Sequence, residues 1–313
     1  MTSSFILCIN AVIPTFLIMA IGFFCKKIGM VDRDIVLRFN KVTFKAFLPV
    51  MLFYNIYSSD LSYAIKPELI VYVVLGIVAE FTISILIAVF ATKDRSKRGT
   101  MVQGMYRANT MVVGLPMAME LLGDVDLGPV VICLAIAVPV FNVLAVIALQ
   151  SFGGEKTKPL KLVKSIITNP LIIATALAIV FSLLSIQLPT AILSTVKSIS
   201  QAASPIMLFL VGAFFTFDKL SYARKELIIT SAFRLMVFPS VFLALGALLG
   251  FRDVEFVALI TVFASSTAIS SFTMAQQLGG DADLAGNIVV ITSALCPFSF
   301  FIWSYLFKIL GIY

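Results

Sequence analysis

The stretch MAMELLGDVDL at residues 117–127 returns late in the chain as MAQQLGGDADL at residues 274–284. Seven of the eleven positions are identical, at an offset of 157 residues. Two shorter matches keep the same order and nearly the same offset, and they pair Pro49–Phe53 with Pro205–Phe209 and Glu68–Ile70 with Glu226–Ile228. Three collinear matches at one spacing indicate that the chain is an internal duplication.

Composition predicts that the whole chain lies in a membrane. Of its 313 residues, 60% are hydrophobic and only 12% are charged, which leaves too little charge for the surface of a soluble domain. Apolar runs of about 20 residues recur, and each is long enough to cross a hydrocarbon core. The predicted spans are approximately Phe5–Phe24, Ile35–Tyr57, Glu68–Ala91, Arg98–Leu122, Gly128–Phe152, Asn169–Ile186, Ala191–Phe217, Leu227–Leu249, Val254–Leu278 and Leu284–Leu310.

The repeat divides these ten spans into two halves, residues 1–155 and residues 156–313. Each half holds an odd number of spans, so the second half enters the membrane from the opposite side. An inverted repeat of this kind lets a transporter present one site alternately to each face of the membrane. The predicted fold class is therefore an all-α polytopic membrane protein built from two inverted five-helix repeats.

Orientation follows from the loops, because cytoplasmic loops carry an excess of Lys and Arg. Cations gather after the first, third, fifth and seventh spans, whereas the alternate gaps hold few, such as Lys66 and Arg252. We therefore expect a multi-pass protein of the cell membrane with both termini outside the cytoplasm. The first apolar run has no basic residues before it, and we interpret it as a retained helix and not as a cleaved signal.

Several functional classes do not fit this sequence. The net charge of +7 comes from cations in short gaps, as the positive-inside rule predicts, so nucleic-acid binding is not indicated. The four cysteines form no CxxC pair and histidine is absent, so no zinc site or histidine-dependent catalysis is expected. An intramembrane aspartyl protease needs paired aspartates within spans, and the aspartates here lie in loops or at span ends. We expect no enzyme, no catalytic residue, no metal site and no cofactor.

The fourth span contains Gly114 and Pro116, which predict an interruption past its middle. In the corresponding part of the ninth span, Ser265–Ser271 holds four serines and a threonine. Interrupted helices at equivalent places in two repeats are typical of a transporter's substrate site, where exposed N–H groups at a helix start suit a carboxylate. A proline kink and close packing through small residues are the simpler readings of the two stretches.

Charged residues within spans are expensive and indicate function. Glu80 would carry a proton, coordinate Na⁺ or pair with a basic residue, and Arg234 would pair with a substrate carboxylate or lock two helices. Arg107 and Glu120 lie nearer the ends of the fourth span, where they could extend toward the interface. Asn142 is a candidate polar contact for substrate, or an interhelical hydrogen bond.

The stretch Asn109–Pro116, followed by Gly123, resembles the fourth-helix motif of the auxin efflux carrier family. That family includes the plant PIN proteins and bacterial malate and malonate permease-like proteins. Further similar stretches, in order along the chain, are Val12–Pro14, Phe47–Phe53, Ser204–Gly212 and Phe233–Pro239.

The resemblance implies a fold like that of the bile-acid sodium symporters. Its scaffold would comprise the first, second, sixth and seventh spans and often forms a homodimer, and the other spans would form a mobile transport domain. Spans four and nine would cross at the midplane, with Asn109 contacting the substrate carboxylate and Pro116 as the crossover proline. No proline occurs in Ser271–Thr273, and the central loop, about Gly153–Leu162, is short. Both departures from the plant carriers favour the bacterial branch.

Together these features predict an elevator-type secondary transporter of a small organic anion, such as malate or an auxin-like acid, with H⁺ or Na⁺ as a candidate coupling ion. A channel, or a carrier of another solute coupled to sodium or protons, is the alternative. A cation–proton antiporter would need aspartates at the crossover, which is uncharged here. The candidate substrate residues are Asn109, Thr110, Gly114, Pro116, Asn142, Ser266, Thr267, Ser270 and Ser271, with Glu80 and Arg234 as candidate charged groups.

Overall fold

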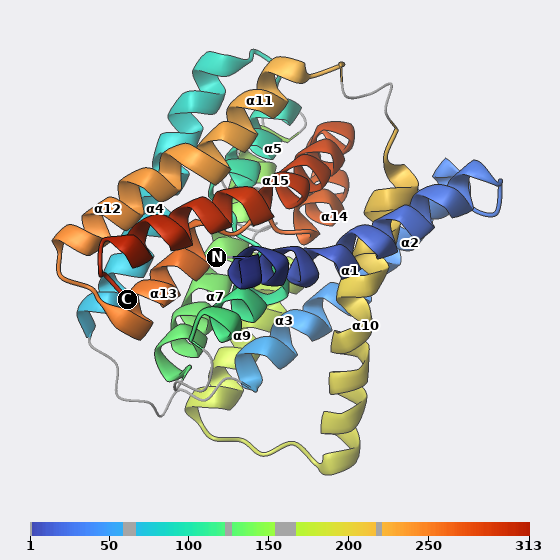
Figure 1. Ribbon diagram of the computed structural model, residues 1–313. Coiled ribbons are helices and arrows are strands. Elements are labelled where there is room, and N and C mark those ends of the chain that lie inside the picture. Colours follow the sequence, from blue (N-terminus) through green and yellow to red (C-terminus); the bar gives the residue numbers. More distant parts are fainter. Residues whose placement is uncertain (1, 59–66, 123–126, 154–166, 217–220) are drawn as a thin grey trace.

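The computed structural model describes residues 2–58, 67–122, 127–153, 167–216 and 221–313 (Figure 1). Within these ranges the chain is helical and forms no β-strand. Helices suit an apolar environment because they satisfy their own backbone hydrogen bonds. The boundary between the predicted halves, the basic residues Lys156–Lys164 and most of the acidic gap at residues 123–126 lie outside the described residues.

The helices follow the predicted apolar stretches closely. They are α1 (Thr2–Lys27), α2 (Arg33–Val42), η1 (Thr43–Phe47), α3 (Leu48–Tyr57), α4 (Pro67–Ala91), α5 (Arg95–Tyr106), η2 (Thr110–Gly114), α6 (Leu115–Leu122), α7 (Gly128–Phe152), α9 (Pro170–Leu183), α10 (Thr190–Phe214), α11 (Arg224–Ala232), η4 (Phe233–Val237), α12 (Phe238–Leu248), α13 (Asp253–Phe263), α14 (Ser270–Gln277) and α15 (Ala282–Ile309). Runs such as α2–η1–α3 and α11–η4–α12 are continuous in sequence.

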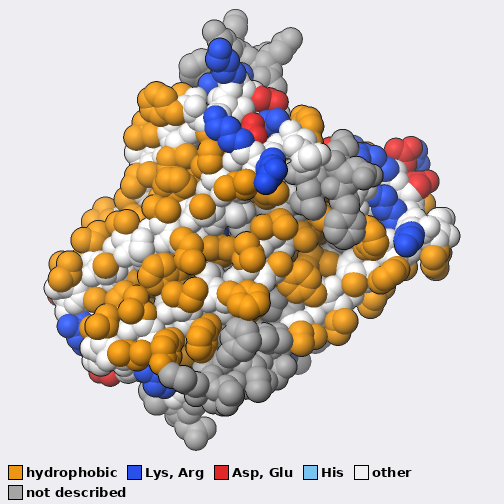
Figure 2. All heavy atoms as spheres, turned by 45° about the horizontal axis from the view of Figure 1, so that its top comes forward, with side chains coloured by type: hydrophobic (Ala, Val, Ile, Leu, Met, Phe, Trp, Pro, Cys, Tyr) orange, Lys and Arg blue, Asp and Glu red, His pale blue; other side chains and the backbone are white. Residues whose placement is uncertain are grey.

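Five helical segments of the described chain are long and apolar enough to cross a membrane. They are α4, α7, α10, α15 and the continuous run Arg224–Leu248. The chain is therefore an all-helical protein with several membrane-capable helices, and the full number of ten spans stays a prediction. Figure 2 shows the matching surface, a broad face of hydrophobic side chains with charged groups gathered toward its edges.

The fourth and ninth predicted spans are each interrupted by non-helical backbone. Residues 107–109 separate α5 from η2, and residues 264–269 separate α13 from α14. The sequence predicts the first interruption at Gly114–Pro116, and this position is wrong. The helix breaks at residues 107–109 instead, where Ala108 pairs with Thr267 of the second interruption. Pro116 instead lies in the first turn of α6.

Prolines explain a different irregularity, the three five-residue π-helical turns of the described chain. Each turn ends two residues before a proline: Thr43–Phe47 before Pro49, Thr110–Gly114 before Pro116 and Phe233–Val237 before Pro239. A proline ring collides with the carbonyl four residues back and removes one donor. A widened turn gives that carbonyl room while the helix continues, so these prolines do not break their helices.

Two groups of helices can be distinguished by their contacts. Helices α1, α3, α9 and α10 pack on one another, and α4, α5, α7, α11, α12 and α13 form the other group, with α15 against α11, α14 and α1. Figure 1 shows α4, α11 and α12 on one side of the molecule and α1, α2 and α10 on the other. Glycines set the approach of α1 to α10, because a Cβ on Gly212 would lie 1.9 Å from the Met19 carbonyl oxygen and one on Gly22 would lie 2.1 Å from that of Phe209.

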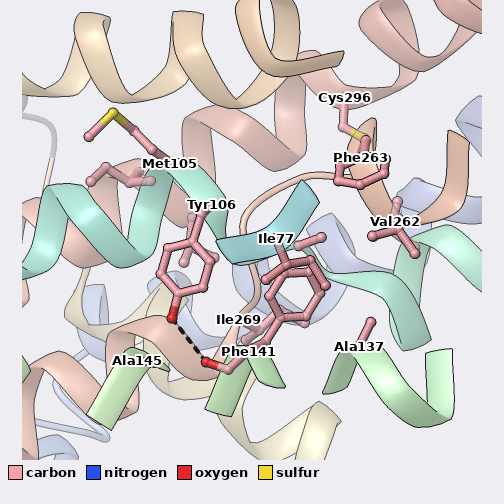
Figure 3. Close-up of a cluster of buried hydrophobic side chains, with 14 of the residues drawn as sticks. Ile77, Met105, Tyr106, Ala137, Phe141, Ala145, Val262, Phe263, Ile269 and Cys296 are labelled. Atoms are coloured by element: carbon pink, nitrogen blue, oxygen red, sulfur yellow. Dashed lines mark hydrogen bonds between the residues drawn. The ribbon is translucent and has the colours of Figure 1, made fainter. Parts of the chain in front are cut away.

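The second group packs around a core of large buried side chains (Figure 3). Ile77 from α4, Phe141 from α7 and Phe263 from α13 gather there with Tyr106, the last residue of α5. The Tyr106 hydroxyl donates a hydrogen bond of 2.9 Å to the Phe141 carbonyl, which Figure 3 draws as a dashed line. This core therefore fixes the end of α5, where the first interruption begins, against α7.

Candidate functional site

The two interruptions meet. Ala108 and Thr267 form an isolated antiparallel bridge. The Asn109 N–H donates to the Ser266 carbonyl at 2.7 Å, and the Ala268 N–H donates to the Arg107 carbonyl at 3.0 Å. The bridge satisfies backbone groups that the broken helices leave free, and it holds four half-helix ends in one place. We call residues 107–109 with residues 264–269 the crossing.

On one side of the crossing, Arg234 binds the carboxyl ends of α5 and α13. Its Nε donates to the Ser265 carbonyl at 2.9 Å, and its Nη1 donates to the Tyr106 carbonyl at 2.9 Å. Nη2 donates to the Phe263 carbonyl at 2.5 Å, and longer bonds reach Met105 and Val262. These are the carbonyls that a helix end leaves unpaired, and a cation also suits the negative end of a helix dipole. Arg234 therefore closes two helix ends at once.

Glu80 balances the charge of Arg234. Its Oε2 lies 3.7 Å from Arg234 Nη1, and both side chains have no exposed surface. Neither carboxylate oxygen of Glu80 has a hydrogen-bond partner among the described residues. The sequence left several roles open for these two residues. In the structure Glu80 pairs with a basic residue, and Arg234 links two helices.

On another side of the crossing lies a cavity of about 240 Å³. Its walls come from α3, α7, α10, the crossing itself and the residues that begin η2 and α14. The cavity thus lies where the two groups of helices face each other. The wall from α10 is polar, with Ser200, Gln201 and Ser204.

Arg107 is the charged residue that faces this cavity. The residue is 3% exposed, and its Nη2 donates to Asn142 Oδ1 at 2.5 Å. The other two nitrogens, Nε and Nη1, are buried and have no hydrogen-bond partner among the described residues. A guanidinium is always charged in proteins and has five donors in a planar fork. Two of its nitrogens therefore have no acceptor within the described chain, and the residue that carries them lines the cavity.

Asn109 adds a further donor at the same wall. Its Nδ2 is buried without a hydrogen-bond partner in the described chain, and the residue is 6% exposed and lines the cavity. The helices that begin at Thr110 and Ser270 also start at this cavity. The positive end of the helix dipole favours an anion. At the start of α14 the Ser271 and Phe272 N–H groups already donate to the Ala268 and Ile269 carbonyls, so it is the dipole and not these N–H groups that acts there. All these features suit one negatively charged ligand.

The cavity brings together four of the nine candidate substrate residues, which are Asn109, Thr110, Asn142 and Ser270. Ser266 and Thr267 lie in the crossing but do not line the cavity, and Ser271 is buried in α14. The Thr267 hydroxyl donates to the Gly104 carbonyl at 2.7 Å, so it supports the crossing. Gly114 permits a close approach, since a Cβ there would lie 2.7 Å from Ser265 Oγ.

Arg107 is the residue whose importance the sequence argument missed. From the sequence we expect Arg107 near a span end, from which a long side chain could reach the interface, and we expect an uncharged crossover. The second expectation is wrong, because the helix breaks at residues 107–109 and Arg107 is part of the crossing. The sequence does contain a signal for Arg107, which is its position two residues before Asn109, the candidate carboxylate contact. A break in the helix between them turns this neighbouring pair toward one cavity.

An all-helical chain with several membrane-capable helices and a cavity beside two interrupted helices has the organisation of a membrane transport protein. A family model described as "Membrane transport protein" matches residues 7–304, so the chain belongs to this family, and the resemblance to the auxin efflux carriers is confirmed. An uncharacterized transporter of Methanothermobacter thermautotrophicus is 22% identical over 298 residues, which are 94% of this chain and 97% of that protein. A second, the uncharacterized transporter MJ1031 of Methanocaldococcus jannaschii, is 20% identical over 307 residues, which cover 95% and 98% of the two chains.

Proposed function

We propose that this protein is a secondary transporter that carries a small organic anion, a carboxylate of the size of malate, through the cavity at the crossing. The observation that supports the proposal is the buried guanidinium of Arg107, a residue of the cavity lining, two of whose nitrogens have no hydrogen-bond partner in the described chain. A buried charge without a partner is strongly unfavourable. An anionic ligand removes that cost, and a carboxylate matches the planar fork of a guanidinium.

Asn109 and the helix starts complete the proposed site. The Asn109 amide would donate to the carboxylate beside Arg107, and Thr110, Asn142 and Ser270 would provide further polar contacts. Ser266, Thr267, Ser271, Gly114 and Pro116 would act through the shape of the crossing and not by touching the ligand. The volume of about 240 Å³ favours a small solute.

The proposed movement is that of an elevator. Helices α1, α2, α3, α9 and α10 would stay fixed, and they would also supply the contact surface of a homodimer. The remaining helices would move together with the crossing. Two features support this division. The cavity lies between the two groups, and Arg234 binds the ends of both α5 and α13, which would then move as one unit.

The proposed architecture is a pair of inverted repeats. The bridged residues Ala108 and Thr267 are 159 positions apart, close to the sequence offset of 157. Antiparallel pairing of two equivalent segments is what an axis in the membrane plane would produce. With the basic loops in the cytoplasm, both termini would lie outside, and fusion of a reporter enzyme that is active only outside the cytoplasm to the C-terminus checks this orientation.

The direct test is counterflow in proteoliposomes that contain the purified protein. Vesicles loaded with unlabelled malate, malonate, lactate or pyruvate should accumulate the labelled form of at least one of these anions. Asn109→Ala should lose most of this uptake while it keeps a folded elution profile, and Gln187→Ala, which removes an exposed amide, should behave as wild type. Full activity in Asn109→Ala would contradict the site, and uptake that does not saturate would favour a channel.

The coupling ion stays open in this proposal. Glu80 would be the proton carrier if transport were proton-coupled, although it lies beside Arg234 and does not line the cavity. Counterflow at two pH values, with and without Na⁺, distinguishes H⁺, Na⁺ and the membrane potential as the driving force. Glu80→Gln should remove a pH dependence that belongs to this carboxyl.

A further inference from the structure

The charge balance of the cavity has a consequence for how a transport cycle can run. Among the described residues that line the cavity, Arg107 carries the only formal charge, and no carboxylate faces it. The one hydrogen-bond partner of its guanidinium in the described part of the chain is the neutral amide of Asn142. Glu80 is paired with Arg234, which itself binds the ends of α5 and α13. The described lining of the empty site therefore carries one positive charge without a counter-charge.

The helix starts at the cavity make this imbalance larger. The N-terminal end of a helix is equivalent to roughly +0.5 of an elementary charge, and the helices that begin at Thr110 and Ser270 both start there. These dipole ends have the same sign as Arg107. No feature of the described lining offsets them, and Arg107 cannot shed its charge by losing a proton.

In any carrier cycle the site must pass through a state that is closed to water on both sides. A site that holds Arg107 and an anion is close to neutral and crosses this state at low cost. An empty site would have to cross it with a bare guanidinium, and a buried charge without a partner is very unfavourable. Return of the empty carrier should therefore be far slower than return of the loaded carrier.

We propose that this protein is an exchanger, in which one organic anion must bind for the site to return after another has been released, and that Arg107 imposes this requirement. The inference rests on the proposed function, because it needs Arg107 to bind the transported anion. It goes beyond that function, since a carrier with a neutral empty site would also catalyse net flux.

The test compares two loads in proteoliposomes of the purified full-length protein. Labelled malate, malonate, lactate and pyruvate are offered in parallel. One set of vesicles contains the same unlabelled anion, and the other contains a zwitterionic buffer without carboxylate. A potassium gradient with valinomycin sets the membrane potential in both. We expect initial uptake to be at least tenfold faster into the anion-loaded vesicles, at any applied potential. Equal rates into both sets would overturn the inference.

Three variants separate the charge of Arg107 from its structural contacts. Arg107→Gln should bind anions more weakly, but its ratio of exchange to net uptake should fall toward one. Arg107→Lys keeps the charge and should keep the ratio. Arg38→Gln removes an exposed cation of α2 that does not line the cavity, and it should match wild type. A wild-type ratio in Arg107→Gln would contradict the role of the guanidinium. If Arg107→Gln has no measurable uptake, the exchange requirement is judged from wild type alone, by its ratio of uptake into anion-loaded vesicles to uptake into anion-free vesicles.

Failure of the exchange requirement can be told apart from failure of the proposed function. Saturable uptake that is equally fast with and without internal anion leaves the carboxylate transporter in place and removes only the exchange requirement. No uptake of any of the four anions in either set, together with no effect of these anions on the melting temperature, would remove both.

Discussion

Arg234 Nη1 lies 3.7 Å from Glu80 Oε2, and neither side chain reaches the surface. The two residues are far apart in the sequence, in η4 and α4. Arg234 also donates to five backbone carbonyls at the ends of α5 and α13, whereas the oxygens of Glu80 accept no hydrogen bond from the described residues. The pair is therefore asymmetric, with Arg234 supporting the crossing and Glu80 supplying the counter-charge.

This asymmetry predicts unequal effects of removing the two partners. Arg234→Met leaves a buried carboxylate and two uncapped helix ends, and it should destabilise the protein by about 3–5 kcal/mol. Glu80→Gln leaves Arg234 bound to its five carbonyls, so its cost should be smaller, on the order of 1–3 kcal/mol. Thermal unfolding in detergent checks the order. A more stable Arg234→Met than Glu80→Gln would contradict the capping role.

Contacts between the two groups of helices predict where a cross-link should stop transport. Asn40 of α2 donates from Nδ2 to Gln276 Oε1 of α14 and accepts from Thr273 Oγ1 at 2.8 Å. In the proposed elevator movement these contacts must break. With the native cysteines replaced, the pair Asn40→Cys and Gln276→Cys should form a disulfide that abolishes counterflow, and a reductant should restore it.

Two single-cysteine variants control for the substitutions themselves and should transport in oxidising conditions. Counterflow at the wild-type rate in the fully cross-linked double variant would show that α2 and α14 do not separate during the cycle, and the elevator proposal would then be abandoned.

The close approach of α1 to α10 predicts that Gly212 tolerates no side chain. A Cβ there would lie 1.9 Å from the Met19 carbonyl oxygen, and backbone cannot move aside cheaply. Gly212→Ala should therefore cost at least about 1–3 kcal/mol, the usual range for overpacking. Gly286→Ala is the matched control, since the nearest atom to its Cβ would be 3.7 Å away. Equal melting temperatures of these two variants would mean that α1 and α10 are less tightly packed.

Asp94 predicts a pH-dependent contribution outside the apolar spans. It is the N-cap of α5, and its carboxylate accepts from the Ser96 N–H at 2.9 Å and the Ser96 hydroxyl at 2.8 Å. Partial burial raises the pKa of this carboxyl, but the hydrogen bonds from Ser96 and Lys97 outweigh it, so that the pKa lies below its ordinary value. A lowered pKa means that the ionised form stabilises the fold, and this contribution is lost as the pH falls through the folded-state pKa.

Asp94→Ala should thus cost about 1 kcal/mol at pH 7, as the loss of an N-cap usually does. The difference in stability between wild type and Asp94→Ala should shrink below about pH 4, the ordinary range of an aspartate pKa. Urea unfolding of both proteins between pH 7 and pH 3 measures it. A difference that stays constant over this range would show that the carboxylate charge contributes nothing.

The sequence was a good guide to helices because long apolar runs leave the backbone few alternatives. It also located two interrupted segments, through Pro116 in one and the serines of Ser265–Ser271 in the other. It misplaced the first break, because a proline can be absorbed by a π-turn, as Thr110–Gly114 does before Pro116. The true break at residues 107–109 contains no proline and depends on pairing with a segment distant in the sequence.

The candidate site could be predicted only in part, because it too depends on segments that are distant in the sequence. The resemblance to the auxin efflux carriers indicated Asn109, and Asn142 is a polar residue within an apolar span; both line the cavity. The sequence argument ranked Arg234 above Arg107, because Arg107 lies nearer the end of its predicted span. Only the fold separates an arginine that binds five carbonyls from one that has two unpartnered nitrogens at a cavity.

The most direct test of the central claim, that Arg107 and Asn109 bind an organic anion at the crossing, is a thermal-shift titration of the purified protein with malate, malonate, lactate and pyruvate. A ligand that binds only the folded state must stabilise it, by about 2.7 kcal/mol at a hundred times its Kd. We predict a rise in melting temperature with at least one of these anions for wild type and Arg38→Gln. In Arg107→Gln and Asn109→Ala that rise should require at least tenfold more anion. A well-folded wild type that responds to none of them, or an equal response in Arg107→Gln, would contradict the account.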